Sequence, residues 1–126
     1  MKLIFVDDCE IWREDMEDVA ADIGIEIQTY SEPSQVNLEK VCSADIVITD
    51  NKFGALGYLG IGLIRSIRAH GYSGRVILYT NYPRPVDIRD TEELEGIVIN
   101  KSMYPQALLE SLGVAMDPSS QVAAPV

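Results

Sequence analysis

The segment Asp45-Ile46-Val47-Ile48-Thr49-Asp50 places four consecutive β-branched residues between two aspartates. Such side chains pack well on a pleated sheet, and an apolar run without alternation is typical of a strand covered on both faces. We therefore predict a buried strand over Asp45–Thr49. Four further runs predict strands, three of them continuous and the last alternating like an edge strand: Leu3–Val6, Arg75–Thr80, Gly96–Ile99 and Ile25–Thr29.

Helical patterns fill the segments between these runs. In Glu10–Ile23 the apolar residues recur every three or four positions, which places them on one face of a helix. Four more helices are predicted: one opened by Ser31-Glu32-Pro33-Ser34 and carrying Val36, Val41 and Cys42, then Gly60–His70, Asp87–Leu94 and Pro105–Ala115. Pro83 and Pro85 should delay the start of the fourth helix to about Val86, because proline does not fit a helix interior.

The alternation of strands and helices predicts the fold class. Parallel strands need crossover connections, which are usually helical and right-handed. A chain of five strands separated by helices is therefore expected to form an α/β fold. Its five-stranded parallel sheet is doubly wound, with helices on both faces.

Length and charge limit the function. The 126 residues suffice for one domain, and 20 acidic against 10 basic residues give a net charge of −10. That charge disfavours direct binding to nucleic acid or to an anionic membrane. The N-terminal apolar run stops at Asp7, too early for a signal peptide, and no stretch approaches the roughly 20 apolar residues of a membrane span. Cys9 and Cys42 lack zinc-site spacing, and we expect two buried or half-buried reduced thiols in a cytoplasmic protein.

Polar residues end or follow four of the five predicted strands: Asp7 with Asp8, Asp50, Thr80, and Asn100 with Lys101. The carboxyl ends of parallel strands lie at one edge of the sheet, where α/β folds bind their ligands. Three neighbouring carboxylates repel one another unless a proton or a cation binds. Oxygen ligands of this kind suit Mg²⁺. We therefore predict one magnesium-binding site at this edge.

The same residues suit phosphoryl transfer. A carboxylate such as Asp50 can act as a nucleophile, and the reaction mainly requires that charge on the peripheral phosphoryl oxygens be neutralised. Lys101 and Thr80 could supply an ammonium and a hydroxyl for that purpose. Simpler interpretations remain open: Asp7 and Asp8 could cap the next helix, and the other residues could be ordinary strand, turn or surface residues.

Five segments resemble the bacterial response-regulator receiver family. They are Phe5-Val6-Asp7-Asp8, Ile46-Val47-Ile48-Thr49-Asp50, Leu63-Ile64-Arg65-Ser66-Ile67-Arg68, Val76-Ile77-Leu78-Tyr79-Thr80 and Lys101. The resemblance covers about residues 2 to 115, nearly the whole chain. It implies a flavodoxin-like strand order 2-1-3-4-5 and a receiver domain over residues 1–116. Residues 117–126 are rich in Ser, Pro and Ala, and we expect them to form an unstructured tail.

The resemblance also implies roles for the strand-end residues. Asp50 would be the phosphoacceptor. Mg²⁺ would be held directly by Asp8 and Asp50, with Asp7 near the metal through water, and by the backbone carbonyl of Lys52. Thr80 and Lys101 would contact the phosphoryl oxygens.

By the same resemblance the chain would be a single-domain response regulator, a phosphoprotein of two-component signal transduction or a phosphorelay. A sensor histidine kinase or phosphotransfer protein would supply the phosphoryl group. The chain would catalyse only its own phosphorylation and slow autodephosphorylation, and so would not be an enzyme in the usual sense. Output would be contact with a downstream protein through the fourth helix, fifth strand and fifth helix.

Three features depart from the family pattern. Ser102 follows Lys101 where proline is usual, so we expect a trans peptide there and an altered path of the lysine. Val98 stands where an aromatic switch residue is common, and the loop over residues 51–58 is Gly-rich and longer than usual. These departures motivate an alternative, a pseudo-receiver that binds a partner without phosphorylation. A small Mg²⁺-dependent hydrolase with an aspartyl nucleophile is a third possibility.

Overall fold

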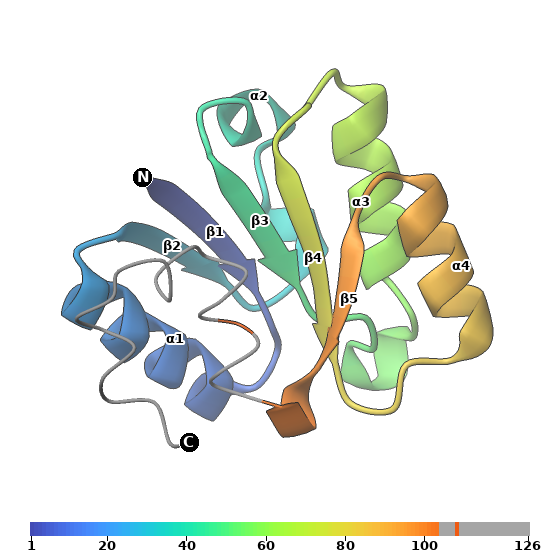
Figure 1. Cartoon of the computed structure of the whole chain (residues 1–126), viewed down its shortest axis with the longest axis horizontal. Helices are drawn as coiled ribbons and strands as arrows, with labels where there is room; N and C mark the ends of the chain where they lie inside the picture. The colour runs from blue at the N-terminus through green and yellow to red at the C-terminus, as the bar shows by residue number, and fades with distance from the viewer. Residues whose placement is uncertain (104–107, 109–126) are drawn as a thin grey trace, which may run out of the picture.

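Five parallel strands form one sheet, in the order β2-β1-β3-β4-β5 (Figure 1). The structure is a computed structural model that describes residues 1–103 and Leu108. The strands are β1 (Lys2–Val6), β2 (Glu26–Tyr30), β3 (Ile46–Thr49), β4 (Arg75–Thr80) and β5 (Ile97–Asn100). The α/β class, the strand order and the edge position of the second strand are all confirmed.

Helices cover both faces of this sheet. They are α1 (Glu10–Ile23), α2 (Leu38–Val41), α3 (Gly60–Ala69) and α4 (Pro85–Glu93). On one face, α1 packs on Phe5, Ile48 and other strand residues that point to its side. On the other face, α2 and α3 pack on the alternate strand residues, such as Val47 and Leu78, with Leu94 against the same cluster (Figure 1). Two apolar layers therefore enclose the sheet, which explains why its central strands lack polar alternation.

The predicted second helix is wrong as a single element. The segment forms a 3₁₀ turn at Pro33–Gln35 and then the short α2. Asn37 separates the two, and its side chain accepts a hydrogen bond from the backbone N–H of Glu39 at 2.9 Å, so it caps α2. Cys42 follows the helix and is exposed, contrary to the expectation of a buried or half-buried thiol, whereas Cys9 is half-buried.

The start of α4 also differs from the prediction. The helix begins at Pro85, not at Val86, because proline is tolerated at the first helical position, where its missing N–H has no partner in any case. Asp87, the third residue of the helix, accepts the backbone N–H of Arg84 at 3.0 Å and so caps this start. The buried residues of α4 are polar, Asp87 and Thr91, whereas Val86 and Ile88 are exposed.

The rest of the chain adds one described residue. Leu108 has helical backbone and is fully buried with the cluster on the α1 side of the sheet. The remainder of the predicted helix Pro105–Ala115 and the predicted tail over residues 117–126 lie outside the described residues. Among residues 1–103, every helix is too short or too polar to cross a membrane.

Candidate functional site

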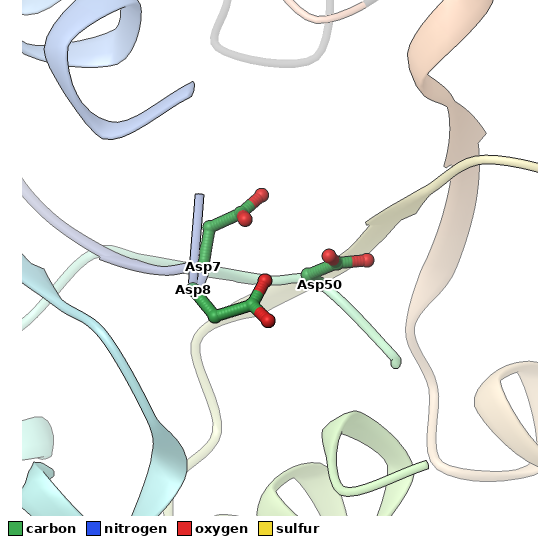
Figure 2. A group of neighbouring side chains, drawn as sticks. All are labelled: Asp7, Asp8 and Asp50. Atoms are coloured by element: carbon green, nitrogen blue, oxygen red, sulfur yellow. The ribbon is translucent and has the colours of Figure 1, made fainter. Parts of the chain in front are cut away.

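Asp7, Asp8 and Asp50 form an acidic trio at the carboxyl edge of the sheet (Figure 2). Strands β1 and β3 are neighbours, with Val6 opposite Thr49, so the residues that follow them emerge side by side. One carboxylate oxygen from each member lies within 4.8 Å of the others. Asp7 and Asp50 are buried and Asp8 is exposed. The structure thus brings together the three carboxylates that the sequence predicted.

Lys101 reaches the trio from the end of β5. Its Nζ donates hydrogen bonds to Asp7 Oδ2 at 2.6 Å and to Asp50 Oδ2 at 3.2 Å. The lysine side chain is only 4% exposed, so these ion pairs are largely shielded from water. Burial raises the pKa of Asp7, and the hydrogen bond and positive charge of Lys101 oppose that increase.

Backbone amides orient the second oxygen of each buried carboxylate. The N–H of Asn51 donates to Asp50 Oδ1 at 2.7 Å, and the N–H of Cys9 donates to Asp7 Oδ1 at 2.9 Å. Each buried aspartate therefore has one oxygen on an amide and one on the Lys101 ammonium. Their orientations are set by the fold rather than by solvent.

Thr80 lies at the same edge, at the end of β4. Because Thr49 is opposite Leu78, Thr80 is one position beyond the level of Asp50 on the adjacent strand. It is buried, and its hydroxyl makes a long contact of 3.5 Å with the carbonyl oxygen of Asn81. The predicted partners of a phosphoryl group, Thr80 and Lys101, thus lie at the carboxyl ends of β4 and β5, at the same edge of the sheet as Asp50.

Lys52 and Tyr82 follow Asp50 and Thr80 by two residues each. Lys52 Nζ lies 5.8 Å from the centroid of the Tyr58 ring, within the range of a cation–π contact. Tyr82 is 91% exposed and does not line the site. The role of the Lys52 backbone carbonyl as a metal ligand stays a prediction.

The donor set fits a hard divalent cation. Three carboxylates and one ammonium, when all are ionised, sum to a charge of −2, which one Mg²⁺ would neutralise. All the acidic donors are oxygen atoms, which suit Mg²⁺ far better than a soft metal. Within the part of the chain that the structure describes, Asp8 forms no ion pair like those of Asp7 and Asp50 with Lys101, and it is exposed, so a metal could reach it from solvent.

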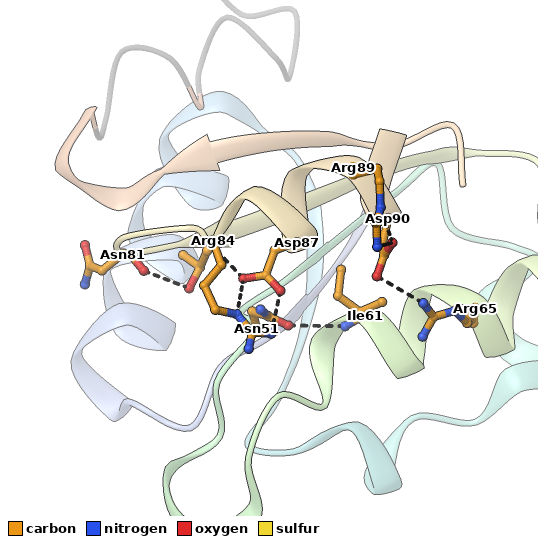
Figure 3. A network of polar contacts seen from close by, with 9 residues as sticks. Asn51, Ile61, Arg65, Asn81, Arg84, Asp87, Arg89 and Asp90 are labelled. Carbon is orange, nitrogen blue, oxygen red and sulfur yellow. Dashed lines mark hydrogen bonds and ion pairs between the residues drawn. The ribbon is translucent and has the colours of Figure 1, made fainter. Parts of the chain in front are cut away.

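The sequence analysis did not predict a polar network around Asn51, the residue that follows Asp50 (Figure 3). The side-chain oxygen of buried Asn51 accepts the N–H of Ile61 at 3.4 Å, and its side chain also hydrogen-bonds Asp87. Asp87 in turn accepts two hydrogen bonds from the Arg84 guanidinium, at 2.9 and 2.7 Å. An acidic residue suits the third position of a helix, where it can accept the N–H of the residue before the helix, so Asp87 had a local signal, but nothing local pointed to Asn51.

The loop over residues 51–58 is tied down at both ends. Lys52 and Tyr58 form an isolated antiparallel bridge around a 3₁₀ turn at Gly54–Leu56. The guanidinium of Arg84 lies 3.5 Å from the Tyr58 ring centroid, a stacking distance. This contact joins the loop after β3 to the loop after β4.

Comparison with known proteins supports the fold. No protein-family model matches the chain, and no curated protein sequence matches it. Among solved structures, chemotaxis protein CheY4 of Vibrio cholerae aligns over 90% of this chain and 96% of its own, with a TM-score of 0.76 and 19% identity. A response regulator receiver domain protein from Clostridium thermocellum aligns over 96% and 98%, with a TM-score of 0.76 and 22% identity.

A third solved structure was determined with a metal. Response regulator TrrA from Thermotoga maritima, in complex with Mg²⁺ and BeF, aligns over 90% of this chain and 96% of its own, with a TM-score of 0.74 and 23% identity. The chain therefore has the fold of CheY-like response-regulator receiver domains, as its strand-end residues had suggested.

Proposed function

We propose that this chain is a phosphoacceptor of the response-regulator receiver class and that Asp50 takes the phosphoryl group. One observation supports this most strongly: buried Asp50 lies within the acidic trio, with its Oδ2 3.2 Å from the Lys101 ammonium. An isolated aspartate in a turn has neither a group of acidic neighbours nor a buried ammonium beside it. A nucleophilic carboxylate needs both the metal-binding carboxylates and the ammonium, because positive charge must offset the negative charge of the incoming phosphoryl group.

The proposed step is a direct phosphoryl transfer. One Asp50 carboxylate oxygen forms an O–P bond while the N–P bond of a phosphohistidine breaks, and the imidazole nitrogen keeps the electron pair and takes up a proton. In this proposal the Lys101 ammonium and the Thr80 hydroxyl would each contact a peripheral oxygen, and the Asn51 N–H, which in this structure donates to Asp50 Oδ1, would contact a third. Water later attacks phosphorus and releases inorganic phosphate.

Magnesium completes the proposed site. Asp8 and Asp50 would bind the metal directly, and Asp7 would lie near it through water. The backbone carbonyl of Lys52 would be a further protein ligand. When bound, the metal supplies positive charge to the trio and to the incoming phosphoryl group. The similar structure of TrrA was solved with Mg²⁺ and BeF, which is consistent with this assignment.

The proposed partners are proteins. A sensor histidine kinase or a phosphotransfer protein would donate the phosphoryl group, and a downstream protein would read the phosphorylated state. The chain would act on itself rather than turn over a separate substrate. Its net charge of −10 disfavours direct contact with nucleic acid or an anionic membrane. We propose that it acts in the bacterial cytoplasm.

Intact-mass measurement tests the proposal. The protein is incubated with Mg²⁺ and an acyl phosphate donor, beside Asp50→Asn and a matched control, Asp15→Asn, which removes one exposed charge on α1. We expect one added phosphoryl group in the wild type and in Asp15→Asn, and none in Asp50→Asn. If folded wild-type protein gains no mass, the phosphoacceptor proposal fails and the pseudo-receiver becomes the better account. Half-buried Val98, with no aromatic ring in its place, is the feature that favours that second candidate.

A further inference from the structure

The Lys101 ammonium meets two aromatic rings as well as two carboxylates. Its Nζ lies 4.8 Å from the centroid of the Trp12 ring and 5.9 Å from that of Tyr79. The two rings stand edge to face, 5.7 Å apart with an interplanar angle of 88°. The ammonium is thus placed between Asp7 and Asp50 on one side and the indole of α1 on the other.

Helix α1 is fixed relative to the same carboxylates. Asp7 Oδ1 accepts the N–H of Cys9, the residue that caps the helix, at 2.9 Å. Arg13, next to Trp12, donates from Nη1 to the backbone oxygen of Asp7 at 2.7 Å. Two hydrogen bonds therefore set the first turns of α1 against the end of β1, and the indole is carried to its place with them.

A lysine needs such support because its stem has four rotatable bonds and its ammonium is a small point charge. Contacts of the ammonium must fix its position, and the Lys101 side chain is only 4% exposed. Tryptophan offers the most favourable aromatic face to a cation, and the interaction strengthens when water is excluded. Asp7 and Asp50 attract the ammonium, but Asp50 is the group that would change on phosphorylation. The Trp12 face would stay in place.

We propose that Trp12 is a positioning residue for Lys101: its ring face holds the ammonium at the acidic trio before and after Asp50 is modified. The inference deepens the proposed phosphoacceptor function and rests on it for its kinetic consequence. When Asp50 accepts a phosphoryl group, Lys101 exchanges a carboxylate oxygen for a phosphoryl oxygen while it keeps its contact with the indole.

The contact itself is measured by NMR, independently of activity. The chain has four lysines, Lys2, Lys40, Lys52 and Lys101, so selective labelling gives a simple spectrum. A ring face shields the methylene and ammonium groups that lie over it. We expect an upfield-shifted Lys101 ε-CH₂ signal, assigned with Lys101→Met, that moves toward the Lys2 and Lys40 positions in Trp12→Leu. An unchanged Lys101 signal in Trp12→Leu would overturn the inference.

The kinetic consequence is measured with an acyl phosphate donor at saturating Mg²⁺. We expect Trp12→Leu to slow phosphorylation about tenfold, and Trp12→Phe, which keeps an aromatic face, to recover most of the rate. Ile11→Ala, at a 67% exposed neighbour on α1, is the matched control and should phosphorylate at the wild-type rate. Circular dichroism verifies that each variant is folded.

A double-mutant cycle separates positioning from general loss of structure. If Trp12 acts through Lys101, Trp12→Leu should add little to the slow rate of Lys101→Met. Equal slowing in both backgrounds, or a Trp12→Leu rate within twofold of the wild type, would contradict a positioning role. Failure of the wild type to be phosphorylated would sink the proposed function alone, because the NMR signal still decides whether Trp12 holds Lys101.

Discussion

The side chain of Asn51 hydrogen-bonds the carboxylate of Asp87, and both residues are buried. Asn51 directly follows Asp50, and Asp87 lies in the first turn of α4 (Figure 3). The backbone N–H of the same asparagine contacts Asp50 Oδ1. The candidate phosphoacceptor is therefore one residue away from a polar connection to α4.

Asp87 should make stability sensitive to acid. The hydrogen bonds from Arg84, chiefly, and from Asn51 hold the pKa of this carboxyl below its usual value, against an opposing effect of burial. A lowered folded-state pKa contributes stability that is present above the unfolded pKa, about 3.9, and is lost as pH falls through the folded pKa. We expect the unfolding free energy of the wild type to fall more steeply below about pH 4 than that of Asp87→Asn.

Chemical denaturation at a series of pH values measures this difference. Glu92→Gln, an exposed charge on the same helix, controls for the loss of one negative charge. At neutral pH Asp87→Ala should cost about 1–3 kcal/mol, because it leaves the buried Asn51 amide without its acceptor. A difference between wild type and Asp87→Asn that does not vary with pH would show that Arg84 and Asn51 do not stabilise the ionised form.

Gly60 should be irreplaceable for the shape of the site. A Cβ at this position would collide with the carbonyl oxygen of Asp50 and lie 2.7 Å from the Cα of Asn51, and neither backbone group can rotate away. The Gly60 N–H also donates to the backbone carbonyl oxygen of Asn51 at 3.0 Å. We expect Gly60→Ala to destabilise the protein by about 1–3 kcal/mol. It should also weaken Mg²⁺ binding, because Asp50 must move.

Gly62, in the same first turn of α3, provides the control. A Cβ on Gly62 meets nothing within 4 Å, and the residue is exposed. Gly62→Ala should therefore stabilise the protein by about 0.5–1 kcal/mol and leave Mg²⁺ binding unchanged. Thermal unfolding with and without Mg²⁺ compares both variants. Equal effects of the two substitutions would contradict the close approach at Gly60.

Asp8 should lower the stability of the metal-free protein and be required for Mg²⁺ binding. In the metal-free protein its charge adds to those of Asp7 and Asp50, all with oxygens within 4.8 Å. Asp8→Asn should therefore raise the unfolding free energy in EDTA by about 0.5–1 kcal/mol, since it removes an exposed repulsive charge. In millimolar Mg²⁺ the wild type should gain stability by mass action, and Asp8→Asn should not.

Differential scanning calorimetry of the wild type and Asp8→Asn, each in EDTA and in Mg²⁺, measures the stability without metal and the gain on Mg²⁺ binding. Asp15→Asn removes the same formal charge from α1, away from the trio, and should keep the Mg²⁺-dependent gain. A gain of equal size in Asp8→Asn would exclude Asp8 from the metal site.

The sequence alone specified much of this molecule. Hydrophobic runs placed the bounds of every strand within one residue of those observed. Helical periodicity gave the bounds of α1 unchanged and those of α3 to within one residue. This succeeds because a strand buried on both faces leaves a continuous apolar run, whereas a helix buried on one face leaves an apolar residue every three or four positions. Strand ends then indicated the acidic trio, because parallel strands end at one edge. The sequence missed the break at Asn37 and the helix start at Pro85, where one side-chain hydrogen bond or one missing N–H decides the outcome.

Only the tertiary structure decided what surrounds Lys101 and Asn51. The Lys101–Asp7 ion pair joins residues 94 positions apart, and the Trp12 ring reaches the same ammonium from helix α1. Asn51 likewise contacts Asp87, from which α3 and β4 separate it along the chain. Periodicity records whether a residue faces inward, but not which inward-facing groups meet; that depends on how the layers pack and on the desolvation that makes each buried polar group find a partner.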